Sequence, residues 1–190
     1  AAEMLEEAGV QMFLHSFVMD ALVEDGKVTG IVLVNKSGVQ AIRAKVTVDC
    51  SADGDVAYRA GCEMAVGRET DGLTQPMTMF FRVAGVDDAE IQRYVDEHPE
   101  EQHLLFHSLI EEKRKTGEWR VPKNHLGIYR TLQPGVYRVN TSRVQGLDGT
   151  NVRDLTRAEI EGRRQAFELL DFFRKYIPGF KHATLIDTAV

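Results

Sequence analysis

Apolar and polar positions alternate in short runs through the first part of the chain. Three runs suited to strands, Phe17–Val23, Val28–Val34 and Val39–Ala44, are separated by polar turns. The turn Asp25-Gly26 is typical of a type I′ hairpin, because that turn needs a positive φ at both central positions. The pattern therefore predicts a three-stranded meander.

Further elements flank this meander. The pattern before it predicts a helix over residues 1–8 that stops at Gly9, followed by a buried strand over Val10–Leu14. After the meander, Val46–Val48 is a compact apolar run typical of a buried strand, and Val56–Ala60 is predicted to resume as a helix.

Longer helical patterns mark the rest of the chain. Met77–Val83 predicts a strand. A capping box formed by Asp87 and Glu90 predicts the start of a helix, which is expected to end at His98-Pro99. A second helix is predicted over Glu100–Thr116.

A hairpin and a long helix complete the pattern. Ile128–Leu132 and Val136–Ser142 are predicted to pair, and a capping box at Thr156 and Glu159 predicts a helix that runs to about Ile177. The apolar face predicted for this helix consists of Phe167, Leu170, Phe173 and Ile177. A final strand is predicted at 183–188, so the fold class is α/β with α+β character.

Composition narrows the class of protein. Hydrophobic residues make up 43% and charged residues 27% of the 190 residues, which is ordinary for a soluble globular protein. The net charge of −6 leaves no basic stripe for a nucleic acid, and no apolar run approaches the ~18 residues of a membrane span. Cys50 and Cys62 lack disulfide-framework and metal-ligand spacing, so we expect two buried thiols in a reducing cytoplasm.

One segment has the pattern of a ligand site. The apolar run Val46–Val48 leads into a short loop of small and acidic residues and then into a helix. Ligands in open α/β sheets lie outside the carboxyl ends of strands, where small residues and free amides at a helix start can approach anionic oxygens. The alternative is structural, because Asp53 or Asp55 can instead cap the helix.

This segment, VTVDCSADGDVAYRA (Val46–Ala60), resembles the second flavin-contacting motif of glutathione-reductase-type FAD proteins. Ala52 stands where that motif usually has a glycine. The blocks GRETDGLTQPMTMFFRVAGVD (Gly67–Asp87) and RVNTSRVQGLDGT…DLTRAEIEGRRQ (Arg138–Gln165) resemble the bacterial FAD-dependent oxidoreductase family. The resemblance implies that residues 1–66 are a partial FAD-binding domain, and that residues 67–190 are a substrate or cap-type region of antiparallel strands and helices.

The resemblance also implies site residues. Those expected to contact FAD are Val18, Ser51, Ala52, Asp53, Gly54 and Asp55. Those expected to face the substrate are Gln75, Arg138, Asn140 and Arg143. Arg138 and Asn140 share one strand face and can bind an anionic or carbonyl group, or they can simply form an exposed polar face. No residue is assigned as catalytic.

The dinucleotide fingerprint G-x-G-x-x-G does not occur in residues 1–190. We therefore expect an internal piece of a larger FAD-dependent oxidoreductase, which transfers hydride between a small-molecule substrate and the flavin. By itself the chain is expected to bind FAD poorly and to need the remaining parts of the parent chain.

Two other functions stay open. A non-catalytic binding or interaction module is compatible with the missing fingerprint. A metal-dependent hydrolase would need Asp53, Asp55, His103 and His107, but these residues match no calcium-loop or HExxH spacing, so no metal is predicted.

Overall fold

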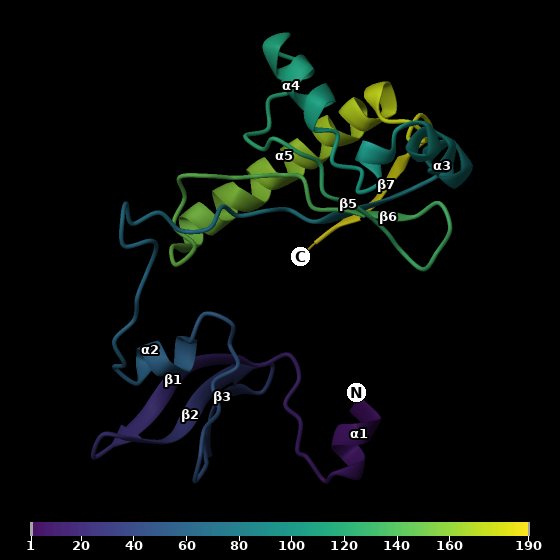
Figure 1. The fold of residues 1–190 in the computed structure, drawn as a ribbon. Helices are drawn as coiled ribbons and strands as arrows, with labels where there is room; N and C mark the ends of the chain where they lie inside the picture. Colours follow the sequence, from purple (N-terminus) through teal and green to yellow (C-terminus); the bar gives the residue numbers. More distant parts are fainter. Residues whose placement is uncertain (1, 190) are drawn as a thin grey trace. The chain divides into compact units, whose positions relative to one another are not determined.

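The computed structural model describes residues 2–189. The chain divides into two compact units, unit 1 at Ala1–Val66 and unit 2 at Gly67–Val190 (Figure 1). Helices and antiparallel sheets occur in the chain, which confirms the predicted mixed α/β class. The roles assigned to residues 1–66 and 67–190 stay predictions.

Unit 1 is built on the meander. Its elements are α1 (Ala2–Glu7), β1 (Phe17–Glu24), β2 (Lys27–Asn35), β3 (Gly38–Arg43) and α2 (Asp55–Arg59). The three strands pair antiparallel in the order β1-β2-β3, as the alternation predicts. The turn between β1 and β2 has φ values of 49° at Asp25 and 72° at Gly26, which confirms the predicted positive φ at both positions.

Two predicted strands of unit 1 are wrong. Residues 10–14 and 46–48 form no strand, and the side chains of Val46 and Val48 are 78% and 79% exposed. A strand needs a hydrogen-bonded neighbour, and neither segment has one within the part of the chain that the structure describes.

Little of unit 1 is buried. Leu33 and Val56 are its buried hydrophobic residues among those described. Its large exposed hydrophobic residues are Met4, Leu5, Val10, Phe13, Leu14, Phe17, Val18, Met19, Val23, Val34, Val39, Val46, Val48, Tyr58, Met64 and Val66.

Unit 2 holds a four-stranded antiparallel sheet and most of the core. Its elements are β4 (Phe81–Ala84), α3 (Asp88–Glu97), a 3₁₀ turn η1 (Pro99–Glu101), α4 (His107–Lys115), β5 (Ile128–Arg130), β6 (Tyr137–Val139), α5 (Val152–Tyr176) and β7 (Thr184–Thr188). The strand order is β5-β6-β4-β7. Figure 1 shows α5 lying along this sheet, and Phe81 of β4 stacks on Phe173 of α5 with ring centroids 6.5 Å apart.

The predicted hairpin and last strand are confirmed, with shorter strands than predicted. β5 and β6 pair antiparallel, and β7 pairs with β4. β4 begins at Phe81 rather than at Met77, which makes a single bridge to Val144.

The capping box of α3 is half confirmed. The Asp87 carboxylate accepts from the amides of Ala89 and Glu90 at 2.9 and 3.0 Å. The amide of Asp87 donates to the carbonyl of Gly179 at 2.9 Å, rather than to the Glu90 side chain. A contact distant in sequence therefore replaces the predicted local one.

The helix predicted over Glu100–Thr116 begins later than expected. Leu104 and Phe106 have φ values of 52° and 51°, which interrupt a helix, so α4 starts at His107. Both side chains are buried in the core of unit 2. Their burial outweighs the helical pattern of the segment.

The start of α5 also differs from the prediction. Asn151 caps the helix by accepting from the amide of Arg153 at 2.9 Å, whereas the Thr156 hydroxyl donates to the Val152 carbonyl inside the helix. Leu170, Phe173 and Ile177 are buried as predicted. Phe167 is 57% exposed, so its place in the apolar face was wrong.

Candidate functional site

The loop between residues 49 and 55 is organised by the carboxylate of Asp49. Its Oδ1 accepts from the amide and the hydroxyl of Ser51 at 3.0 and 2.6 Å, and its Oδ2 accepts from the amide of Ala57 at 2.9 Å. These bonds, the Ser51 hydroxyl first, lower the pKa of Asp49. The carboxylate thus fixes the loop onto the first turn of α2 in its ionised form.

Ser51 makes the second connection. Its hydroxyl oxygen accepts from the amide of Asp55 at 2.7 Å. The cap position Gly54 has no side-chain bond, so the structural alternative, capping of the helix by Asp53 or Asp55, does not occur. Because Ser51 and Asp49 occupy two amides of the first turn, the prediction of free amides there was wrong for Asp55 and Ala57.

The backbone of the loop is turned sharply. Ala52 and Gly54 have φ values of 71° and 74°, in the left-handed region. A non-glycine residue in this region costs about 1–2 kcal/mol, so Ala52 makes the loop less stable than a glycine would. The amides of Ala52, Asp53 and Gly54 donate to no group within residues 2–189.

Other residues of unit 1 lie outside this loop or differ from prediction. Val18 lies in β1 opposite Leu33, and no contact joins it to the loop among the described hydrogen bonds. Cys50 and Cys62 are exposed, so the prediction of two buried thiols was wrong. They flank α2 in irregular segments that carry no buried core.

In unit 2, Arg138 lies on the exposed face of the sheet. It stands opposite Arg82 and Tyr129 in the strand register. Its guanidinium lies over the rings of Phe80 and Tyr129, 5.3 Å from each centroid. The two rings hold the cation in place by cation–π attraction.

Asn140 connects this sheet face to two other segments. Its side-chain oxygen accepts from the Thr78 hydroxyl at 3.1 Å, and its backbone carbonyl accepts from Nζ of Lys123 at 2.5 Å. The Thr78 hydroxyl is also 2.8 Å from the carbonyl of Ser142. These hydrogen bonds fix the position of Asn140. The bond from Lys123 joins two residues that are 17 positions apart in the sequence.

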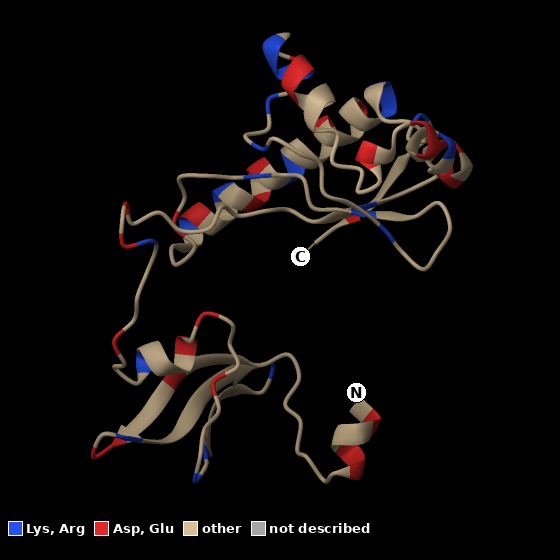
Figure 2. Ribbon diagram, in the orientation of Figure 1, with Lys and Arg blue, Asp and Glu red and all other residues tan. Residues whose placement is uncertain are grey.

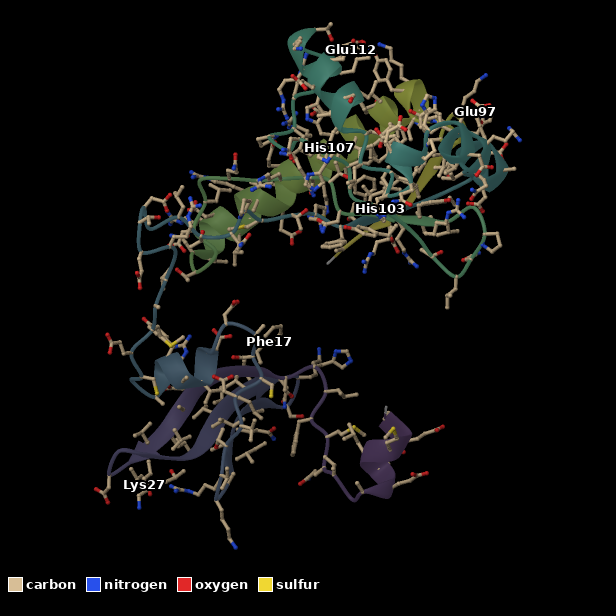
Figure 3. All side chains as sticks on the ribbon, viewed as in Figure 1. Phe17, Lys27, Glu97, His103, His107 and Glu112 are labelled. Atoms are coloured by element: carbon tan, nitrogen blue, oxygen red, sulfur yellow. The ribbon has the colours of Figure 1, made fainter. Side chains whose placement is uncertain are left out.

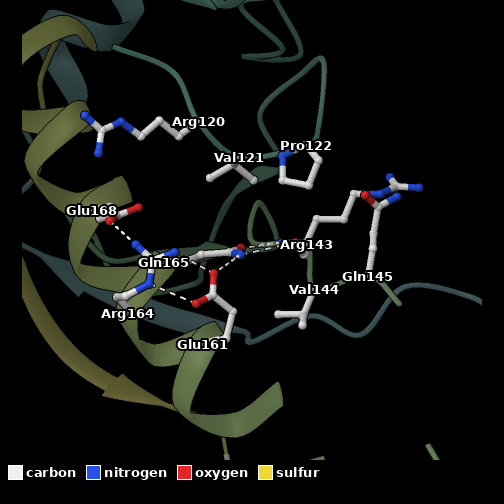
Figure 4. Close-up of a pocket in the computed structure, with 10 residues that line it drawn as sticks. All are labelled: Arg120, Val121, Pro122, Arg143, Val144, Gln145, Glu161, Arg164, Gln165 and Glu168. Atoms are coloured by element: carbon white, nitrogen blue, oxygen red, sulfur yellow. Dashed lines mark hydrogen bonds and ion pairs between the residues drawn. The ribbon is translucent and has the colours of Figure 1, made fainter. Parts of the chain in front are cut away.

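Arg143 is fixed at its backbone. The buried amide of Gln165 accepts from the Arg143 amide at 2.8 Å and donates to the Arg143 carbonyl at 3.2 Å (Figure 4). Nε of Arg143 is buried and has no hydrogen-bond partner among the described residues. The side chain borders a pocket of about 300 Å³ together with Arg120, Gln145 and Arg164.

A family model described as FAD dependent oxidoreductase matches residues 1–190. The chain belongs to the FAD-dependent oxidoreductase family. Membership of this family implies FAD as the cofactor, oxidoreduction as the general activity and a small molecule as the class of substrate. No curated protein and no solved structure gives a significant match.

The loop of this FAD-dependent oxidoreductase chain fits a flavin nucleotide. The amides of Ala52, Asp53 and Gly54, which donate to no described group, can donate to phosphate or ribose oxygens, and the residues at 52 and 54 are small enough for close approach. Asp49 and Ser51 fix the loop that carries these amides. They are not themselves assigned a contact with the ligand.

Sequence reasoning missed two basic residues of unit 2, Lys123 and His125. Partial burial, and then the charge of Arg143, lowers the pKa of Lys123. Burial, followed by Lys123, His107 and Arg143, lowers the pKa of His125. No local signal could have found them, because their neighbours lie far away in sequence.

The predicted substrate residues are not all brought together. Arg138 lies on the exposed face of β6, the half-buried Asn140 comes directly after this strand, and Arg143 follows in the same segment. Gln75 lies in the exposed segment before Met77, and no hydrogen bond joins it to the other three among the described residues.

The histidines form no metal centre in the part of the chain described. His103 lies in the turn before α4 and His107 is the first residue of α4, so they do not share one helix face (Figure 3). The ring of His107 is instead 5.6 Å from that of His125. Residues 2–189 contain no group of three side chains suited to a metal ion, and none of their helices is long and apolar enough to cross a membrane.

Proposed function

We propose that the chain is an internal part of a larger FAD-dependent oxidoreductase that transfers hydride between a small-molecule substrate and the flavin. The observation that carries this proposal is the loop at 49–55, which Asp49 and Ser51 hold and in which three successive amides donate to no group among the described residues. When bound, the flavin supplies the redox chemistry. The chain's own residues position the cofactor and the substrate.

The exposed apolar surface of unit 1 supports its role as part of a larger FAD-binding domain. A three-stranded meander with two buried hydrophobic side chains buries too little surface to be stable by itself. Further protein that carries a dinucleotide fingerprint would cover this surface and complete the cofactor site.

Unit 2 supports a role on the substrate side. Arg138 is held by two aromatic rings, and Asn140 is held by Thr78 and Lys123. Residues fixed in this way can orient a carbonyl or anionic group without first being ordered by the ligand. Gln75 belongs to the same proposed substrate region but lies on a less constrained segment.

The test is the visible absorption spectrum of the full parent protein, purified and reconstituted with FAD. The proposal predicts a stoichiometric yellow complex that bleaches when a substrate reduces it without oxygen. The isolated 190-residue chain, carried through the same steps, is expected to retain little flavin. A parent protein that stays colourless after reconstitution would overturn the proposal.

A further inference from the structure

Two cations of unit 2, Lys123 and Arg143, have no carboxylate partner among the described residues and belong to one small region, because Lys123 Nζ bonds the carbonyl of Asn140, three residues before Arg143. Lys123 is half-buried and uses one of its three N–H groups to bond the carbonyl of Asn140. Nε of Arg143 is buried and unpaired. Within residues 2–189, neither side chain forms an ion pair with an aspartate or a glutamate.

The absence of a carboxylate partner contrasts with the neighbouring helix α5, where arginines form ion pairs. In the pocket that Arg143 borders, Arg164 forms ion pairs with Glu161 and Glu168 (Figure 4). Figure 2 shows acidic and basic residues interspersed along the whole of α5. Partial burial of a cation without a counter-charge is costly, so a pair of such cations indicates a place where an anion is bound from outside.

The two cations are also held in fixed positions. Gln165 binds both backbone polar groups of Arg143, and Asn140 anchors Lys123. Gly127 brings the segment of Lys123 against Asn140, because its amide donates to the Thr141 hydroxyl at 3.0 Å and its carbonyl accepts from the Asn140 amide at 2.7 Å. A ligand would therefore meet donors that are already ordered.

Polar neighbours complete the cluster. His125 lies two residues after Lys123, and its ring is 5.6 Å from that of His107. The His125 ring therefore brings a further polar group to this region. The adjoining pocket of about 300 Å³, which Arg143 lines, has room for the body of a small molecule.

We propose that Lys123 and Arg143, with His125 beside them, form a binding site for an oxyanion group, a carboxylate or a phosphate, of a small molecule. The ligand would have a negatively charged end, which accepts hydrogen bonds from the lysine ammonium and the arginine guanidinium. That this ligand is the redox substrate rests on the function proposed above, whereas the anion site itself does not.

The experiment is a titration of the 190-residue chain, followed by backbone NMR shifts, with succinate, with inorganic phosphate and with chloride at equal ionic strength. We expect saturable shifts confined to residues near 121–127 and 138–145 for succinate or phosphate. Chloride is expected to give none. The arm that saturates at lower concentration identifies the anion as carboxylate or phosphate.

Substitutions make the test specific. Arg143→Gln and Lys123→Gln should each weaken binding by about tenfold or more, the loss expected for one charge-assisted bond. Arg143→Lys keeps the positive charge but loses the planar guanidinium group, so its affinity for the anion should lie between those of the wild type and Arg143→Gln. Arg93→Gln, which removes an exposed arginine of α3 without a described partner, is the matched control and should change binding less than twofold.

The fluorescence of the single tryptophan, Trp119, reports whether each variant is folded, because this residue is buried in the core of unit 2. If one variant fails to fold, the other two decide the outcome. Absence of saturable binding by succinate and phosphate, or equal weakening by Arg93→Gln, would overturn the inference. Neither result depends on FAD, so the flavin spectrum of the parent protein would stay an independent test.

Discussion

Tyr137 donates its phenolic hydrogen to Oδ1 of Asp88 at 2.6 Å, which joins β6 to the first turn of α3. The other carboxylate oxygen of Asp88 accepts from the amide of Gly135 at 2.7 Å. The Tyr137 hydrogen bond is the main cause that lowers the pKa of Asp88, while burial, and then Asp88, raises the pKa of Tyr137. One carboxylate thus fixes the β5–β6 hairpin on which Arg138 and Asn140 lie.

Tyr137→Phe should lower the free energy of unfolding of unit 2 by about 1–2 kcal/mol, because the part-buried Asp88 carboxylate loses its hydrogen bond from the tyrosine hydroxyl. Urea unfolding followed by Trp119 fluorescence measures this change. Tyr129→Phe is the matched control, since the Tyr129 hydroxyl has no hydrogen bond among the described residues. Equal losses in the two variants would show that the hydroxyl bond contributes nothing.

The same pair predicts a pH dependence. The pKa of Asp88 is lower in the folded state than in the unfolded state. The contribution of Asp88 to the free energy of unfolding is therefore fully present above the unfolded pKa of about 3.9, and it is lost as the pH falls through the lower folded pKa. Unfolding free energies measured from neutral to strongly acidic pH should therefore fall more steeply in the wild type than in Tyr137→Phe. Parallel curves would contradict the prediction.

Gly127→Ala should destabilise unit 2 by about 1–3 kcal/mol, the usual cost of overpacking. A Cβ at this position would lie 2.5 Å from the carbonyl oxygen of Asn140, the atom that also anchors Lys123. Gly149→Ala is the control, because its nearest contact would be Cε of Met77 at 3.6 Å. Thermal melts of both variants measure the loss of stability. An unchanged melting temperature in Gly127→Ala would show that the segments of Gly127 and Asn140 can move apart without loss of stability.

Ala52→Gly should strengthen flavin binding by the parent protein, because glycine removes a left-handed strain of about 1–2 kcal/mol from the loop. Flavin dissociation constants measured by fluorescence quenching test this prediction. Ala60→Gly, at an ordinary φ of −76°, should give no such gain. Weaker binding by Ala52→Gly would mean that the methyl group itself contacts the ligand.

Cys50 and Cys62 should both react with a thiol reagent in the folded chain, since both are exposed. Colorimetric titration without denaturant is expected to reach two thiols per chain, and the variants Cys50→Ser and Cys62→Ser assign each one. Reaction that begins only after denaturation would show that other protein surface covers them.

Local signals in the sequence predicted much of the fold. The meander follows from alternation and from the Asp25-Gly26 turn, and the end of α3 follows from His98-Pro99. The failures have a common cause in distant contacts. Strand pairing at 46–48 needs a neighbour, and the positive φ of Leu104 and Phe106 follows from burial.

The same limit applied to the candidate site. The loop at 49–55 could be found from its small residues, but the central role of Asp49 depends on a bond that reaches Ala57, eight residues away. Arg143 was predicted as a polar candidate, while Lys123 was missed because its contact with Asn140 spans 17 residues. Residue type indicated the chemistry, and only the fold showed which groups lie together.

The most direct measurement of the central claim is the flavin content of the parent protein carrying Asp49→Ala. This change removes the carboxylate that holds Ser51 and Ala57, so flavin affinity should fall by about tenfold or more while the melting of unit 2 is unchanged. Glu63→Gln, an exposed residue of unit 1 with no described partner, is the control and should retain full flavin. Full flavin content in Asp49→Ala would contradict the assignment of this loop to the cofactor.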